Sequence, residues 1–284
     1  MINTSVAHAE NSAQNNYCQG TPTLPTGTVL TRCLQIRPEQ RYFLYLPRKK
    51  RFEDCRVFVS VHGISRNAKI HARFFAQFAE QYGVVLVAPL FDKALHPRYQ
   101  RFGFDGVRAD IMLQYICSEV AQFTGADVSQ LYMFGYSGGG QFVHRYAMAY
   151  PEQVAALAVG AAGWYTFPDP SRAFPYGIQP HHKLQDLHFD LERFLQIPAT
   201  VFVGDRDIER DDALRKSQHL DIEQGDTRLS RGQRWIAAMQ SAAEARGIKT
   251  RYQFESLPES DHSFSRCVRR GNLCGKVFQH LFGE

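Results

Sequence analysis

A serine surrounded by glycines is the part of the sequence best suited to chemistry. Ser137 lies in the stretch "GYSGG", residues 135–139, which has the pattern G-x-S-x-G and follows an apolar run. Glycine weakens strands and helices, so this cluster indicates a turn where the backbone must pass close to its neighbours. Between a strand and a helix, the pattern places the serine hydroxyl at the top of a sheet. The sequence therefore predicts Ser137 as a nucleophile rather than as an incidental serine in a Gly-rich connection.

A serine hydroxyl needs a base to activate it and an acid that orients the base. With this motif the three residues follow in the order Ser, acid, His. The acid is expected just past a later strand, where "TVFVGDRD" offers Asp205 and Asp207. We favour Asp207, which leaves room for the chain to turn beyond the strand, and keep Asp205 as the alternative. The base is expected after the last strand, where "LPESDHSF" supplies His262 in a loop.

The tetrahedral intermediate of such a reaction needs N–H donors where its negative charge develops, and losing one donor costs about 3 kcal/mol. One donor is expected to be the backbone N–H of Gly138, directly after the nucleophile. The other should come from the loop after an earlier strand, where His62 and Gly63 precede Ile64. The Ile64 N–H is the candidate, with His62 bracing the loop. Trp164, after another strand end, is a candidate for the substrate pocket, with core or lid packing as the alternative.

Strands and helices that would position these residues alternate along the chain. Apolar, β-branched runs predict strands at 28–36, 41–47, 56–63, 84–90, 129–137, 154–163, 198–205 and 249–257, the first two joined as a hairpin by 37–40. Helical spacing of apolar residues predicts helices at 68–83, 106–125, 138–153, 231–247 and 275–282. This alternation predicts an α/β fold with a mainly parallel sheet covered on both faces. Such sheets carry their sites at the carboxyl ends of the strands.

The pattern indicates one domain with a distinct arm. Residues 1–27 are rich in Asn, Ser, Thr and Pro and are expected to be a flexible arm. Residues 28–284 are expected to form a single domain. Within it, residues 164–197 are rich in Pro, aromatic residues and His and break the alternation. We expect this stretch to be an insertion that shapes a pocket.

Composition argues against several other classes. The 284 residues are 44% hydrophobic and 21% charged, with a net charge of +5, as in an ordinary globular protein. The one basic run, at 48–51, is expected to be a solvated loop, so no nucleic-acid partner is predicted. No apolar stretch reaches the roughly 18 residues needed to span a membrane. The N-terminus shows no signal-peptide pattern, so a cytoplasmic protein is expected unless a signal has been removed.

Metal and disulfide signals are weak. No H-E-x-x-H or C-x-x-C pattern occurs, so no metal site is predicted. Three histidines fall in the insertion and are not expected to bind zinc: His181, His182 and His188. Three acidic residues after the candidate acid are expected to form a solvated face: Glu209, Asp211 and Asp212. Two cysteine pairings are conceivable, Cys18 with Cys33 and Cys267 with Cys274.

Together, these motifs resemble those of the α/β-hydrolase family over about residues 40–284. The resemblance rests on His-Gly after a central strand, the G-x-S-x-G turn, the Gly-x-x-Asp at 204–207 and the late His. Within that family, "VHGISRNA" and "GYSGGGQFVHRYAMAYPEQVAALAV" look like the polyhydroxybutyrate depolymerase and feruloyl-esterase group. The chain differs from that group in lacking a visible secretion signal. It also carries Ile64 where those enzymes commonly have Cys.

The resemblance implies a serine esterase that works through Ser137, His262 and Asp207 and an acyl-enzyme. It implies no metal or organic cofactor, and the expected partner is a small-molecule or oligomeric ester substrate. A peptidase or amidase using the same residues is one alternative. A non-catalytic binding module on the same scaffold is another, disfavoured because all three residue types occur in the expected order.

Overall fold

The computed structural model describes residues 24–48, 51–103 and 107–283 and is built on an eight-stranded sheet. The predicted arm lies mostly outside these residues. The strands are β1 (Val29–Leu34), β2 (Arg37–Tyr45), β3 (Arg56–Val61), β4 (Val85–Pro89), β5 (Asp127–Tyr136), β6 (Val154–Gly160), β7 (Ala199–Gly204) and β8 (Tyr252–Leu257). Their order across the sheet is β1-β2-β4-β3-β5-β6-β7-β8.

The six strands from β4 to β8 pair in parallel, and β1 and β2 run antiparallel at one end. The prediction of a mainly parallel sheet is therefore confirmed. Because parallel strands end at a common edge, the segments that follow β3, β5, β7 and β8 come together in space, although they are far apart in the sequence. Each of these four segments carries a predicted site residue.

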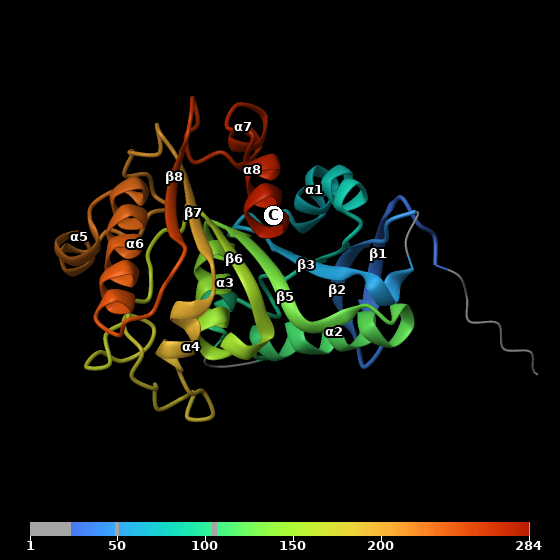
Figure 1. Ribbon diagram of the computed structural model, residues 1–284, viewed down its shortest axis with the longest axis horizontal. Helices are drawn as coiled ribbons and strands as arrows, with labels where there is room; N and C mark the ends of the chain where they lie inside the picture. Colours follow the sequence, from blue (N-terminus) through green and yellow to red (C-terminus); the bar gives the residue numbers. More distant parts are fainter. Residues whose placement is uncertain (1–23, 49–50, 104–106, 284) are drawn as a thin grey trace, which may run out of the picture.

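Helices cover both faces of the sheet (Figure 1). On one face lie α1 (Ala68–Tyr82), α7 (Phe264–Arg269) and α8 (Leu273–Phe282). The other face is covered by α2 (Ala109–Thr124), α3 (Gly138–Ala149), α4 (Leu191–Gln196) and α6 (Arg228–Glu244), and α5 (Gln218–Gln224) packs outside α6. This is the two-sided covering that buried, near-continuously apolar strands require.

Aromatic side chains fill the layer between the sheet and the first of these faces. Phe58 on β3 is fully buried, with its ring centroid 5.0 Å from that of Phe75 on α1 and 4.8 Å from that of Phe278 on α8. Edge-to-face pairs at such distances contribute about 0.5–1.5 kcal/mol each beyond the burial of their surface. The cluster fixes α1 and α8 against the strands that carry the site.

The structure differs from the predicted elements in two respects. Residues 37–40, predicted as the hairpin connection, belong to β2, so only residues 35 and 36 make the turn. Two contacts outweigh the polarity of this stretch. Leu34 pairs with Arg37, and the buried Gln40 side chain donates to Leu90 O. The short helices α4, α5 and α7 were not predicted, because six or seven residues give too few turns for a helical period to show.

Two further expectations concern the cysteines and membrane-spanning helices. Cys267 and Cys274 are buried, separate thiols rather than a disulfide, while Cys18 lies outside the described residues. Among the described residues, no helix combines the length and apolar character needed to cross a bilayer.

Candidate active site

Ser137 lies at the turn between β5 and α3, as its motif predicts. Its backbone has φ 54° and ψ −112°, a region that residues other than glycine rarely occupy. Such a conformation costs of order 1–3 kcal/mol and persists only where the surroundings enforce it. Here the Ser137 N–H donates to Gly160 O at 2.7 Å, and Ser137 O accepts from Gln141 N at 3.1 Å. The serine is thus held between β6 and the first turn of α3.

Close backbone contacts explain the glycines on either side of Ser137. A Cβ on Gly135 would lie 2.1 Å from Gly139 O, and a Cβ on Gly139 would lie 2.1 Å from Val61 O. Neither position has room for a side chain, since real Cβ atoms do not approach other atoms so closely. The glycines therefore allow α3 to start directly against β3 and β5, which lifts Ser137 above the sheet.

The structure brings together three side chains that the sequence separates by more than fifty residues. His262 Nε2 lies 3.0 Å from Ser137 Oγ, and His262 Nδ1 lies 2.7 Å from Asp207 Oδ2. The Asp207 side chain is 1% exposed, whereas that of His262 is 20% exposed. The imidazole also stacks on the Tyr136 ring, with 5.6 Å between the centroids. This arrangement can pass a proton from the hydroxyl to an imidazole whose far nitrogen faces a buried carboxylate.

Asp205, the alternative acid, makes different contacts. Its two carboxylate oxygens accept the N–H groups of Glu259 and Ser260 at 3.1 and 3.0 Å. Glu259 and Ser260 lie in the short segment that leads to His262. These hydrogen bonds lower the pKa of Asp205. Asp205 thus fixes the loop that carries the imidazole, and Asp207 contacts the imidazole itself.

Arg228 is a member of the site that the sequence did not indicate. It lies at the start of α6, is 1% exposed, and its Nη1 lies 3.2 Å from Asp207 Oδ1. The same guanidinium also donates to both carboxylate oxygens of Asp211, which lowers the pKa of Asp211. Asp211 is therefore bound to a buried arginine and is not part of a solvated face. Since an unpaired buried charge is costly, Arg228 stabilises the negative charge of Asp207.

Loop residues after β3 lie directly beside Ser137. A Cβ on Gly63 would lie 3.4 Å from Ser137 Cβ, and a Cβ on Gly138 would lie 3.4 Å from Ile64 N. The two predicted N–H donors, Ile64 and Gly138, thus belong to neighbouring backbone segments next to the hydroxyl. Donors in such a position can stabilise an oxyanion.

His62 anchors this loop through both ring nitrogens. Nδ1 lies 2.7 Å from Gly63 O, and Nε2 accepts from Phe91 N at 3.0 Å. Nδ1 therefore carries the proton, because Gly63 O can only accept, and the ring is neutral. Burial lowers the pKa of His62 to about 4. The sequence-based expectation that His62 braces the loop agrees with these contacts.

Two buried, neutral histidines predict that acid destabilises the fold. His144 resembles His62: its Nδ1 lies 2.8 Å from Gly140 O, its Nε2 accepts from Thr166 N, and burial lowers its pKa well below 6.5. Between pH 6.5 and about 4, these two imidazoles bind protons in the unfolded chain but stay neutral in the folded one. The free energy of unfolding should therefore fall with decreasing pH, by up to about 1.4 kcal/mol per pH unit for each histidine. Urea unfolding at pH 7.5, 6.0 and 5.0 measures this slope, and equal stability at the three pH values would contradict it.

Ser137 lines two cavities, one on each side. The first, here called the arginine cavity, has a volume of 230 Å³, and its lining includes Arg101, Trp164 and Arg215. The second, here called the histidine cavity, has a volume of 310 Å³, and its lining includes His262 and Phe264. Ile64, Ala213 and Ser137 line both. Trp164, predicted as a pocket residue, is thus placed at the site, although its ring is largely buried.

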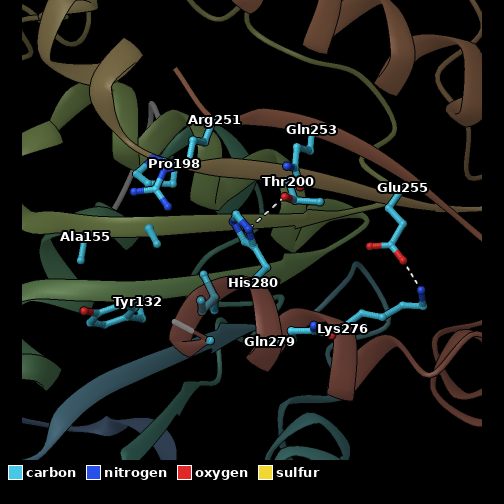
Figure 2. A pocket seen from close by; sticks show the side chains of 13 residues that line it. Tyr132, Ala155, Pro198, Thr200, Arg251, Gln253, Glu255, Lys276, Gln279 and His280 are labelled. Atoms are coloured by element: carbon cyan, nitrogen blue, oxygen red, sulfur yellow. Dashed lines mark hydrogen bonds and ion pairs between the residues drawn. The ribbon is translucent and has the colours of Figure 1, made fainter. Parts of the chain in front are cut away.

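A larger cavity lies away from these residues, between α8 and strands β5 to β8 (Figure 2). Its volume is 660 Å³. His280 is in its lining, with Nδ1 3.0 Å from Thr200 Oγ1 and Nε2 3.0 Å from Leu157 O. Lys276 pairs with Glu255 across it. Since these polar groups bind one another, they hold α8 to the sheet.

Within the described part of the chain, no three His, Cys, Asp or Glu side chains are grouped so that they could hold a metal ion. In the 164–197 stretch, His181 packs against His182, with 4.2 Å between the ring centroids.

Comparisons with known proteins support the fold. No protein-family model matches the chain, and no curated protein matches it. Among solved structures, poly(aspartic acid) hydrolase-1 from Sphingomonas sp. KT-1 has a TM-score of 0.75 at 23% identity, over 89% of this chain and 99% of that one. The poly(3-hydroxybutyrate) depolymerase LpqC from Bordetella parapertussis has a TM-score of 0.68 at 26% identity, over 84% and 88%. An S-formylglutathione hydrolase from Agrobacterium tumefaciens has a TM-score of 0.56 at 15% identity, over 89% and 94%.

These neighbours are hydrolases, and one of them is a depolymerase of the kind that the motifs resemble. The predicted resemblance is confirmed: the chain has the α/β-hydrolase fold and is similar to the serine esterase-like hydrolases built on it.

Proposed function

We propose that this chain is a serine hydrolase that cleaves carboxylic esters through an acyl-enzyme. The observation that carries the proposal is the continuous contact from Ser137 Oγ through the His262 ring to Asp207, at 3.0 and 2.7 Å. A hydroxyl on a strained turn, a base within hydrogen-bond reach and a buried carboxylate behind that base together define an activated nucleophile.

In the proposed reaction, Ser137 Oγ attacks the ester carbonyl carbon while His262 Nε2 takes the hydroxyl proton. The N–H groups of Gly138 and Ile64 stabilise the negative charge on the carbonyl oxygen. His262 then gives its proton to the leaving alcohol, and the acyl group stays on Ser137. Next, His262 removes a proton from water, whose oxygen attacks the acyl carbon. The bond between that carbon and Ser137 Oγ then breaks, His262 returns the proton to Oγ, and the acid leaves. Throughout, Asp207 orients the imidazole and stabilises its charged form.

Cleavage of amides is a second candidate function with its own support. The neighbour with a TM-score of 0.75 is a hydrolase of poly(aspartic acid), a polymer joined by amide bonds. An amine is a poorer leaving group than an alcohol, so it depends more strongly on protonation by the histidine.

Turnover of an activated ester and of an activated amide separates the two candidates. We expect the purified protein to hydrolyse p-nitrophenyl acetate and to leave an aminoacyl p-nitroanilide largely intact. Release of p-nitrophenol or p-nitroaniline, followed by absorbance, measures both. Faster turnover of the anilide would favour the amidase. Absence of turnover of either substrate, in a protein that a fluorophosphonate also fails to label, would contradict both.

A further inference from the structure

The arginine cavity beside Ser137 is lined by positively charged side chains. Its polar side chains, apart from the serine, are Gln100, Arg101, Gln141 and Arg215. Its lining, as far as the described residues provide it, contains no Asp or Glu. Two guanidinium groups thus face a small space next to the candidate nucleophile.

A third guanidinium lies behind Trp164. Arg145 on α3 is fully buried, with its Cζ 4.2 Å from the centroid of the Trp164 ring. The Cζ of Arg215 lies 5.3 Å from the same centroid. Arg145 Nη1 donates to Gln100 O at 2.6 Å and to Gln141 Oε1 at 3.3 Å. Arg145 thereby holds the Gln100 backbone and the Gln141 side chain of the cavity wall, and it adds a positive charge behind that wall.

Elsewhere in the site, buried arginines are neutralised by carboxylates. Arg228 pairs with Asp207 and Asp211, and Arg231 pairs with Asp221 at 2.8 Å. By contrast, neither Arg145 nor Arg215 forms an ion pair with any described residue. Within the same residues, Arg145 Nη2 also has no hydrogen-bond partner, although it is buried.

Like charges gathered in a partly buried place are costly unless an anion compensates them. Burial and the neighbouring positive charges of Arg98 and Arg215 lower the pKa of Arg101. At Arg145, burial and the charges of Arg101 and Arg215 lower the pKa in the same way. Bidentate binding of a carboxylate by a guanidinium is the pairing that satisfies such groups best.

The position of His262 decides which part of an ester enters this cavity. The leaving alcohol must lie within reach of His262 Nε2, because this nitrogen protonates it. His262 lines the histidine cavity and not the arginine cavity. The alcohol part therefore occupies the histidine cavity, and the acyl part extends toward Arg101 and Arg215.

We propose that the arginine cavity binds a carboxylate on the acyl part of the substrate, so that the preferred substrates are hemiesters of short dicarboxylic acids. This inference rests on the proposed function, since it assigns the two sides of Ser137 by the path of the proton. A cavity of 230 Å³ is small beside the roughly 300–1,000 Å³ of sites for drug-sized ligands. A short acyl chain that ends in a carboxylate fits it better than a long or aromatic acid.

Two esters of nearly equal shape test the proposal. Monoethyl glutarate carries a carboxylate at the end of its acyl chain, and ethyl 5-amino-5-oxopentanoate carries a neutral amide there. We expect kcat/KM to be about ten- to hundred-fold higher for the charged ester, as a charge-assisted hydrogen bond warrants. Arg215→Gln, at an exposed position, should remove most of this preference, mainly by lowering kcat/KM for the charged ester. Lys216→Gln removes the same charge one residue further along and should change neither value.

Each outcome bears on the proposal separately from the proposed function. Turnover of both esters by the parent but not by Ser137→Ala, with no preference for the charged one, would overturn the carboxylate site and leave the hydrolase standing. If neither ester is cleaved, titration calorimetry of glutarate with Ser137→Ala still decides. Saturable binding that Arg215→Gln weakens at least tenfold supports the site, and no saturable binding, or binding that Arg215→Gln leaves unchanged, contradicts it.

Discussion

Replacing Ser137 with alanine is expected to lower ester turnover by roughly 10⁴- to 10⁶-fold. The loss is large because no other hydroxyl takes the place of Ser137 Oγ, which lies 3.0 Å from His262 Nε2. Without it no acyl-enzyme forms, and His262 has only water to activate. Hydrolysis of p-nitrophenyl acetate measures the rate, and a fluorophosphonate, which reacts with activated serines, should label the parent but not the variant.

The matched control is Ser265→Ala. Ser265 lines the histidine cavity, as Ser137 does, but it is not bound to the imidazole. Its replacement should leave the labelling intact and lower the rate far less than Ser137→Ala does. Equal labelling of Ser137→Ala and the parent would remove Ser137 from the mechanism, whatever the rates.

Asp207→Asn is expected to lower kcat by roughly 10⁴-fold. The carboxylate oxygen that accepts from His262 Nδ1 at 2.7 Å fixes the proton on Nδ1 and leaves Nε2 free to act as the base. A neutral amide at that place does not fix the proton on Nδ1, so Nε2 is not kept free to act as the base. It also cannot stabilise the imidazolium that forms. Since the effect falls on the reacting imidazole, kcat should drop far more than KM rises.

Asp205→Asn is the comparison that tests the choice of acid. Asp205 accepts two loop N–H groups and has no contact with the imidazole, so the variant should lose about tenfold in kcat at most. Its midpoint of urea unfolding should fall, because an amide has only one oxygen to accept the two donors. A larger loss of kcat in Asp205→Asn than in Asp207→Asn would show that the acid was wrongly assigned. Circular dichroism of both variants separates loss of activity from loss of folding.

Much of the fold could be predicted because its signals are local. Helices α1, α2, α3 and α6 carry apolar residues at helical spacing, and strands β3 to β7 are short apolar runs. The glycines around Ser137 could be interpreted because steric exclusion, such as the 2.1 Å from a Cβ on Gly139 to Val61 O, depends on residue type alone. Chain order then pointed to Asp207 and His262, and the structure places His262 against Ser137 and Asp207 against His262.

The remaining features depend on contacts between residues far apart in the sequence, which leave no periodic or compositional pattern. Nothing local marks Arg228 as the partner of Asp207, or assigns Asp205 to the loop before His262 rather than to the imidazole. No local pattern marks the short helices α4, α5 and α7 either, because tertiary packing stabilises them more than their own few turns do.

The sequence by itself determined the alternation of strands and helices, the sharp turn at Ser137 and the order of the three residues that meet there. Only the tertiary structure decided how the charges around them are paired. It joins Arg228 to two carboxylates and leaves Arg145 and Arg215 without a described ion pair beside Trp164. The physical reason is that a charge is stabilised by whatever lies within a few ångströms in space, and folding alone sets those neighbours.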